Sequence, residues 1–444
     1  MRRARCVSDG LRAKRAESVS DGSSLLANQP LNRGRSPGIL HGCAIALSLF
    51  GTCAVAAPPT FVVRKANGTD IRAPLASMDA TFRLEVGAKV LRKLGADEWL
   101  SIRQAGLDRP PLPSDEQIVL AFGDRIPARD LRLDDEKLRF RHPDLEGGKD
   151  SLVPIAAVAM VWRLATDGTV HAARQRNDLL RTKRKRDTIL LRNGDRIEGT
   201  LEALSANEVE VEVARKKVVA KWPQVSAVLL STDLTEKGRP KESQARLVLS
   251  ATERSPGGRF AVVAPTCDGV TFTAKTTFGA VLRVPIERVV SLDLIANQIV
   301  YLSELTPSEY TYAPYLDEKF PYRIDANVVG RELLLAGSYY DKGVGLHAGS
   351  RISYPLGGKF RRFDALVGLD DLDGREGEVR IRLLLDGKAA DLGKTDWTSD
   401  DKAVRVSVDV AGVKEMTLVV ESAGKGPIRG AVDVVEARLI RASP

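Results

Sequence analysis

Cysteine is nearly missing from most of this 444-residue chain. Three of its four cysteines, Cys6, Cys43 and Cys53, come before residue 57, and Cys267 is the only one that follows. A single thiol cannot form an internal disulfide, so the later part must be stabilised by its hydrophobic core. That one remaining cysteine, with only four histidines in the whole chain, also argues against a structural zinc site.

Aromatic residues are scarce too, at 5% of the chain, so surfaces on which sugars or bases can stack are few. Their distribution is uneven, because all eight tyrosines lie between Tyr301 and Tyr354. This change of composition near residues 297–301 predicts a domain boundary there.

Charged residues are missing between residues 36 and 63. Within this stretch, an apolar run at 44–50 is followed by small residues up to position 57, and Arg33 and Arg35 precede it. That order is typical of a secretory signal peptide. Residues 1–57 are therefore predicted to be a leader that directs the chain to the periplasm or the outside of the cell, with a retained membrane anchor as the alternative.

Most of the excess positive charge belongs to that leader. The chain has 67 basic and 58 acidic residues, and its first 56 residues hold eight of the former and three of the latter. The remaining 59 basic and 55 acidic residues nearly balance, which argues against nucleic acid as a partner. The basic run at 181–186 is interpreted as a solvated linker.

The sequence of residues 58–296 predicts an array of small antiparallel β units. The array is divided into a first half at 58–180 and a second half at 187–296. Strand-like runs are short, alternate with period two and are bounded by turn residues. No amphipathic helix of ten or more residues is predicted.

A weak internal repeat runs through this region. Hairpins are predicted at 61–71, 117–126 and 188–199, and the last contains an Asn-Gly pair that favours a tight turn. Three units close on a proline followed by a valine-rich run, and the proline is expected to begin an edge strand. Asp124 and Asp195, which lie beside glycines, are interpreted as turn residues rather than catalytic acids.

Residues 297–444 carry a series of motifs in a characteristic order. The motifs are Val300–Leu305, Ala326–Leu333, Lys342–Ala348, Arg351–Leu356, Arg362–Asp371, Val379–Lys388, Val408–Val413 and Met416–Val420. In that order they resemble the NPCBM family of carbohydrate-binding modules, also described with glycoside hydrolase family 98. The resemblance implies a galactose-binding-like β-sandwich, or jelly roll, with a carbohydrate or a cell-surface glycan as partner. The whole chain is accordingly predicted to be all-β.

Near its end the chain departs from the family pattern. Members commonly carry Asp-His, an acid and then Trp just before the final strand. Asp433 and Glu436 match the acidic positions here, whereas Gly430, Ala431 and Val434 stand where the family has Asp, His and Trp. The resemblance therefore implies the fold more strongly than it implies sugar binding.

Several side chains of the module are candidate ligand contacts, because sugar sites combine polar groups with apolar rings. These candidates are Tyr339, Tyr340, His347, Trp397 and Asp433. The alternatives are a partly buried histidine that holds a loop and a tryptophan that covers one end of the sandwich. Gly343 and Gly345 are expected to serve backbone geometry.

An acidic loop offers the one candidate metal site. Calcium prefers clustered carboxylate oxygens, and the loop supplies Asp370, Asp371, Asp373 and Glu376. The spacing does not match an EF-hand, and a solvated turn is the alternative.

Three functional hypotheses follow. We expect a secreted, non-catalytic protein whose module binds a glycan, with the β units as a spacer or scaffold. The first alternative is an extracytoplasmic structural or assembly protein that uses the sandwich for protein contacts. The second is a glycoside hydrolase with its site in residues 60–296.

Overall fold

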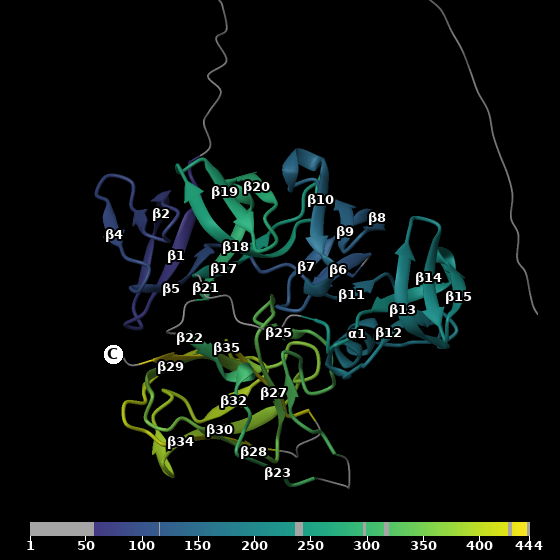
Figure 1. The fold of residues 1–444 in the computed structure, drawn as a ribbon. Helices are drawn as coiled ribbons and strands as arrows, with labels where there is room; N and C mark the ends of the chain where they lie inside the picture. Colours follow the sequence, from purple (N-terminus) through teal and green to yellow (C-terminus); the bar gives the residue numbers. More distant parts are fainter. Residues whose placement is uncertain are drawn as a thin grey trace, which may run out of the picture. The chain divides into compact units, whose positions relative to one another are not determined.

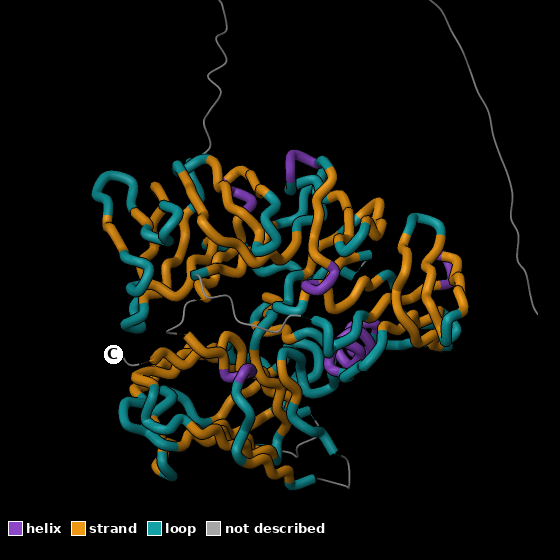
Figure 2. The backbone as a smooth tube through the Cα atoms, viewed as in Figure 1, coloured by secondary structure: helices purple, strands orange, loops and turns teal. Residues whose placement is uncertain are grey.

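The computed structural model describes residues 57–114, 116–235, 243–295, 299–314, 319–424 and 429–441. The predicted leader lies outside these residues except for Ala57, as do three of the four cysteines. Strands dominate the described part (Figure 2), and the all-β prediction is confirmed. Within that part, no helix has both the length and the apolarity needed to span a membrane.

The region before the module consists of four antiparallel β units (Figure 1). The first contains β1 (Thr60–Lys65), β2 (Asp70–Met78), β3 (Leu84–Val86), β4 (Arg92–Leu94) and β5 (Trp99–Gln104). The second contains β6 (Gln117–Leu120), β7 (Arg125–Pro127), β8 (Arg129–Asp134), β9 (Lys137–Arg141), β10 (Asp150–Pro154) and β11 (Val158–Trp162). The third contains β12 (Asp187–Leu191), β13 (Arg196–Leu204), β14 (Glu208–Val213), β15 (Lys216–Lys221) and β16 (Val225–Leu229). The fourth contains β17 (Gln244–Leu249), β18 (Gly258–Cys267), β19 (Thr271–Thr276), β20 (Val281–Pro285) and β21 (Val289–Ile295).

Each unit closes on itself, because its first and last strands pair antiparallel: β1 with β5, β6 with β11, β12 with β16 and β17 with β21. The predicted hairpins are present as β1–β2, β6–β7 and β12–β13. The closing strands also pair between units, and they do so out of chain order. Strand β16 pairs β11, which joins the third unit to the second, whereas β21 pairs β5, which joins the fourth unit to the first.

The prediction that the prolines at the unit ends begin edge strands is wrong. Pro154 and Pro285 are the last residues of β10 and β20, and each leads into a short 3-10 turn, η2 (Ile155–Ala157) or η4 (Ile286–Arg288). Pro223 lies inside the equivalent turn, η3 (Trp222–Gln224). Proline suits this position because its fixed φ fits the first turn of a helix, where its missing N–H has no partner to lose.

The expectation of no ten-residue helix is wrong, since α1 spans Ala172–Arg181. Its buried face includes Arg176 and Asn177 beside Leu179, so apolar residues do not recur with helical spacing. Arg176 pairs with Glu332 at 2.7 Å, and Asn177 donates to the carbonyl of Gly330 at 3.2 Å. Polar contacts hold this helix, which explains why hydrophobic periodicity does not reveal it.

The module is a sandwich of two antiparallel sheets. One contains β22 (Ile299–Tyr301), β24 (Arg323–Ile324), β27 (Gly343–His347), β29 (Phe360–Leu369), β33 (Val404–Asp409) and β35 (Ala431–Arg441). The other contains β23 (Glu309–Tyr312), β28 (Ser350–Pro355), β30 (Glu378–Leu385), β31 (Lys388–Ala390), β32 (Asp396–Thr398) and β34 (Glu415–Ser422). Two small elements complete the module, the hairpin of β25 (Leu333–Leu335) with β26 (Ser338–Tyr340), and the turn η5 (Leu302–Glu304).

A buried cluster of ions connects the first and fourth units with the module. Asp293 on β21 accepts hydrogen bonds from Arg109 and from Arg438 on β35, the latter at 2.6 Å. Glu436 accepts from Arg103 at 2.5 Å and lies 3.1 Å from Arg109. We call these five residues the ion cluster. Burial alone would raise the pKa of Glu436, but the three guanidinium groups lower it well below its usual range.

Candidate functional site

The structure separates the predicted contacts instead of gathering them on one exposed surface. Tyr339 is half-buried on β26, and the next residue, Tyr340, is buried with its ring 5.4 Å from the Arg103 guanidinium and 5.6 Å from that of Arg109. The Tyr340 hydroxyl also accepts a hydrogen bond from Arg103 at 3.3 Å. Tyr340 therefore packs on the ion cluster, and alternation along the strand leaves only Tyr339 partly open.

Trp397 and Asp433 are both fully buried. Trp397 lies on β32 inside the core of the sandwich, so it is neither an exposed platform nor in a loop. Asp433 lies on β35 beside Asp370, and burial together with the nearby Asp370 carboxylate raises its pKa well above the usual range. In this conformation neither side chain faces solvent.

His347 is buried at the end of β27 but belongs to a cluster of aromatic rings. Its ring stacks on Phe320, with centroids 4.2 Å apart and planes 18° from parallel. Tyr312 approaches edge-on, with its hydroxyl 3.4 Å from Nδ1 of the histidine. That nitrogen also lies 3.1 Å from the Ala348 carbonyl oxygen. The histidine thus holds the rings in place, which matches the loop-holding alternative.

Four half-buried aromatic residues lie on the two segments that contact His347, and none of them was among the predicted contacts. They are Tyr310 and Tyr312 on β23, and Phe320 and Tyr322 in the segment before β24. Tyr310 and Tyr322 lie with ring centroids 4.7 Å apart. Residues two apart on a strand share a face, so the spacing of the two β23 tyrosines is the sequence signal that could have identified them. We call Tyr310, Tyr312, Phe320, Tyr322 and His347 the aromatic cluster.

The aromatic cluster combines features that sugar recognition requires. Partly exposed rings offer apolar faces to the C–H surfaces of a pyranose, and tyrosine hydroxyls offer hydrogen bonds at their edges. Burial raises the pKa of Tyr310, so its hydroxyl stays protonated and able to donate at neutral pH. Tyr310 donates to the Phe320 carbonyl at 3.1 Å, which ties the two segments of the cluster together.

The carboxylates of the acidic loop are each engaged by different protein groups. Asp370 accepts from two backbone N–H groups of its own loop, and Asp371 accepts from the N–H of Gly337 at 2.7 Å. Asp373 pairs with Arg331, and Glu376 pairs with Arg429. Across the described residues, no three His, Cys, Asp or Glu side chains converge in a way that could hold a metal ion. The calcium site stays a prediction without geometric support.

The two acids of the unit hairpins differ in environment. Asp195 is exposed in its turn, as interpreted from the sequence. Asp124 is buried and accepts a hydrogen bond from the Ala261 N–H of β18, so it joins the second unit to the fourth. Burial raises its pKa to about 6. Its contacts are those of a structural residue.

Comparison with known proteins identifies the C-terminal region. Residues 298–440 match the model of the NPCBM/NEW2 domain family. A CBM51 module from Clostridium perfringens GH95, solved with methyl-galactose, is 28% identical and covers 32% of this chain and 99% of its own, with a TM-score of 0.28. The CBM51-2 and INT domains of Clostridium perfringens ZmpB, solved with GlcNAc, are 23% identical and cover 41% of this chain and 37% of theirs, with a TM-score of 0.30.

A curated relative from Renibacterium salmoninarum carries the provisional name endo-α-N-acetylgalactosaminidase. It is 29% identical over 115 residues, which is 26% of this chain but only 8% of that protein. The C-terminal region therefore resembles a carbohydrate-binding module, as its motifs predict.

Proposed function

We propose that this chain is a secreted, non-catalytic protein whose module binds a glycan through the aromatic cluster. The observation that carries the proposal is the group of half-buried rings around His347 within a domain that matches the NPCBM/NEW2 model. Two CBM51 modules were solved with methyl-galactose and with GlcNAc, which supports a galactose- or GlcNAc-containing glycan as the first ligand to test.

The alternatives have weaker support. An assembly role for the module is favoured by the loss of the family's Asp, His and Trp at Gly430, Ala431 and Val434. A glycoside hydrolase is suggested by the name of one relative, yet the match covers only a small share of that protein. The buried acids of the β units, such as Asp124 and Asp144, accept hydrogen bonds from structural partners and do not form a paired site in a cleft.

The test is glycan-array binding and affinity gel electrophoresis of the full chain against Tyr312→Ala and Tyr339→Ala variants. We expect Tyr312→Ala to weaken binding at least tenfold, because base or sugar stacking on one ring is worth about 1–3 kcal/mol. Tyr339→Ala should bind as the parent does. Unchanged binding by a folded Tyr312→Ala variant, or a loss confined to Tyr339→Ala, would place the contact elsewhere and refute the aromatic cluster as the site.

A further inference from the structure

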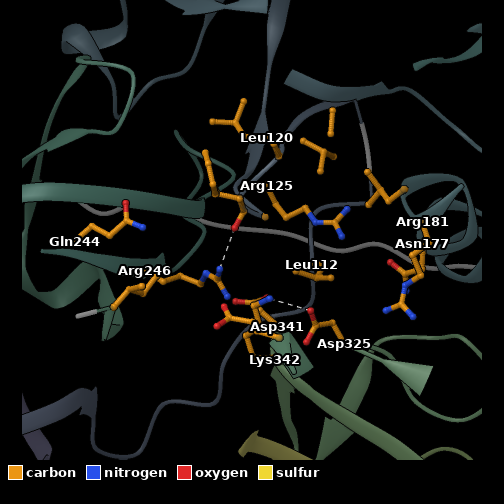
Figure 3. Close-up of a pocket in the computed structure, with 18 residues that line it drawn as sticks. Leu112, Leu120, Arg125, Asn177, Arg181, Gln244, Arg246, Asp325, Asp341 and Lys342 are labelled. Atoms are coloured by element: carbon orange, nitrogen blue, oxygen red, sulfur yellow. Dashed lines mark hydrogen bonds and ion pairs between the residues drawn. The ribbon is translucent and has the colours of Figure 1, made fainter. Parts of the chain in front are cut away.

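A cavity of about 450 Å³ is lined by residues that do not belong to the aromatic cluster (Figure 3). Its lining comes from the second unit, helix α1, the fourth unit and the start of the module. A volume in this range suits a small ligand of one or two sugar rings. Its polar lining includes Arg125, Gln244, Arg246, Asp325, Asp341 and Lys342.

Several of the charged side chains in the cavity already have partners. Lys342 pairs with Asp325 at 2.9 Å, and one oxygen of Asp341 pairs with Arg259 at 3.1 Å. Arg246 donates to the Phe122 carbonyl at 3.1 Å. The two dashed contacts in Figure 3 mark the first and the last of these interactions.

Three buried polar atoms in the lining lack a hydrogen-bond partner among the described residues. They are Nη1 of Arg125, Oε1 of Gln244 and Oδ2 of Asp341. Gln244 is 4% exposed, and the Asp341 side chain is 10% exposed. A buried polar atom without a partner costs roughly 1–3 kcal/mol, so the cavity holds one charged donor and two acceptors that a bound molecule would satisfy.

Arg125 is the cation with the least compensation. Burial, together with the neighbouring Arg176 guanidinium, lowers its pKa to about 9. Figure 3 shows its guanidinium directed between Arg246 on one side and Asn177 and Arg181 on the other. An anionic group placed there would neutralise a charge that the protein leaves unmatched.

We propose that this cavity binds a sugar acid, with the carboxylate of the ligand on Arg125 and its hydroxyl groups donating to Gln244 and Asp341. A guanidinium binds a carboxylate through parallel N–H donors. Hydroxyl groups are the donors that two unmatched acceptors require, and a simple anion would leave both acceptors without a partner. The site is distinct from the aromatic cluster and does not depend on the function proposed for it.

The experiment is isothermal titration of the full chain with sodium D-glucuronate, using D-glucose and sodium acetate as probes of the ring alone and the charge alone. We expect D-glucuronate to bind at least tenfold more tightly than either probe. Arg125→Met should weaken glucuronate binding at least tenfold, which corresponds to about 1.4 kcal/mol. Arg361→Met, an exposed arginine outside the cavity, is the matched control and should bind as the parent does.

Gln244→Leu keeps the approximate size of the side chain and removes the acceptor proposed for a ligand hydroxyl group, so it tests the site even if Arg125→Met fails to fold. We expect it to weaken glucuronate binding at least tenfold as well. No heat of binding at about 10 mM glucuronate, which would fill a site with a Kd of about 1 mM, overturns the proposal. Equal binding of acetate overturns the assignment to a sugar acid. Tyr312→Ala should leave glucuronate binding unchanged, which separates this site from the proposed glycan site.

Discussion

The ion cluster predicts that one buried carboxylate controls the stability of the joined units and module. The perturbation is Asp293→Asn, which keeps the side-chain volume and removes one negative charge. Asp293 is 3% exposed and accepts hydrogen bonds from Arg109 and Arg438, whose side chains are equally buried. After the substitution, both guanidinium groups stay buried. Glu436 is then the one carboxylate of the ion cluster left to balance them and the guanidinium group of Arg103.

The expected loss in the free energy of unfolding follows from the burial of these charged groups. Two carboxylates and three guanidinium groups give the ion cluster a net charge of +1, and the substitution raises it to +2. Breaking a buried ion pair by removing one partner costs about 3–5 kcal/mol, because an uncompensated charge is left in a medium that solvates it poorly. We expect Asp293→Asn to lower the free energy of unfolding by that amount.

The matched control is Asp396→Asn on the module surface. Asp396 also accepts two hydrogen bonds from guanidinium nitrogens, both from Arg380 at 2.7 and 2.9 Å, but the two side chains are 42% and 48% exposed. Exposed pairs contribute about 0–1 kcal/mol. The two substitutions are chemically identical and both remove a carboxylate that accepts two guanidinium hydrogen bonds, so the difference in their effects reports mainly on burial.

The assay is equilibrium unfolding in urea, followed by tryptophan fluorescence and by circular dichroism. Trp99 and Trp162 report on the units and Trp397 on the module, so coincident transitions would show that these parts unfold together. Equal m-values in parent and variant would show that the change lies in stability alone. A difference between Asp293→Asn and Asp396→Asn below about 1 kcal/mol would refute the reasoning.

Two further predictions concern the module itself. Asp433→Asn should raise stability at pH 7 by roughly 1–3 kcal/mol, because the raised pKa means that the fold disfavours the ionised carboxylate. In the parent protein, the cost of burying Asp433 is absent below the unfolded-state pKa of about 3.9 and grows as pH rises toward the folded-state pKa. Thermal melts should therefore show that the stability gained by Asp433→Asn becomes smaller as pH falls toward 4. A loss at pH 7 would contradict the assignment. Gly345→Ala should cost about 1–3 kcal/mol in a urea titration, since its Cβ would lie 2.5 Å from the Ala326 carbonyl oxygen; an unchanged midpoint would show that the glycine does not serve close packing.

Local features of the fold can be read from the sequence because they depend on a few neighbouring residues. The turn at Asp386 and Gly387 is one example: φ is +46° and +79° there, as a tight hairpin between β30 and β31 requires. The hairpins of the first three units and the order of the module motifs are similar in kind. Helix α1 could not be predicted from such local patterns, because its buried face includes polar residues whose partners lie in distant segments.

The candidate site could be predicted only in part, for a related reason. His347 was identified, but its partners Tyr312 and Phe320 come from other segments and are set by tertiary packing. Alternation along a strand places one of two adjacent tyrosines in the interior, yet it could not show that Tyr340 would pack on arginines from more than 200 residues earlier in the chain. Burial of Trp397 likewise depends on how β32 adds to its sheet.

The pairing of β5 with β21 has a consequence for the timing of synthesis. Ile102 pairs with Leu292, so about 190 residues must be made before the outer edge of β5 finds its partner. At roughly 5–20 residues per second, a nascent chain carries that open edge for about 10–40 s. An unpaired edge is a template for association with other chains, so a ribosome-bound intermediate and any truncation that ends before β21 share the same exposed strand. The nested order of the units thus makes completion of the fourth unit the step that covers the open edge of the first.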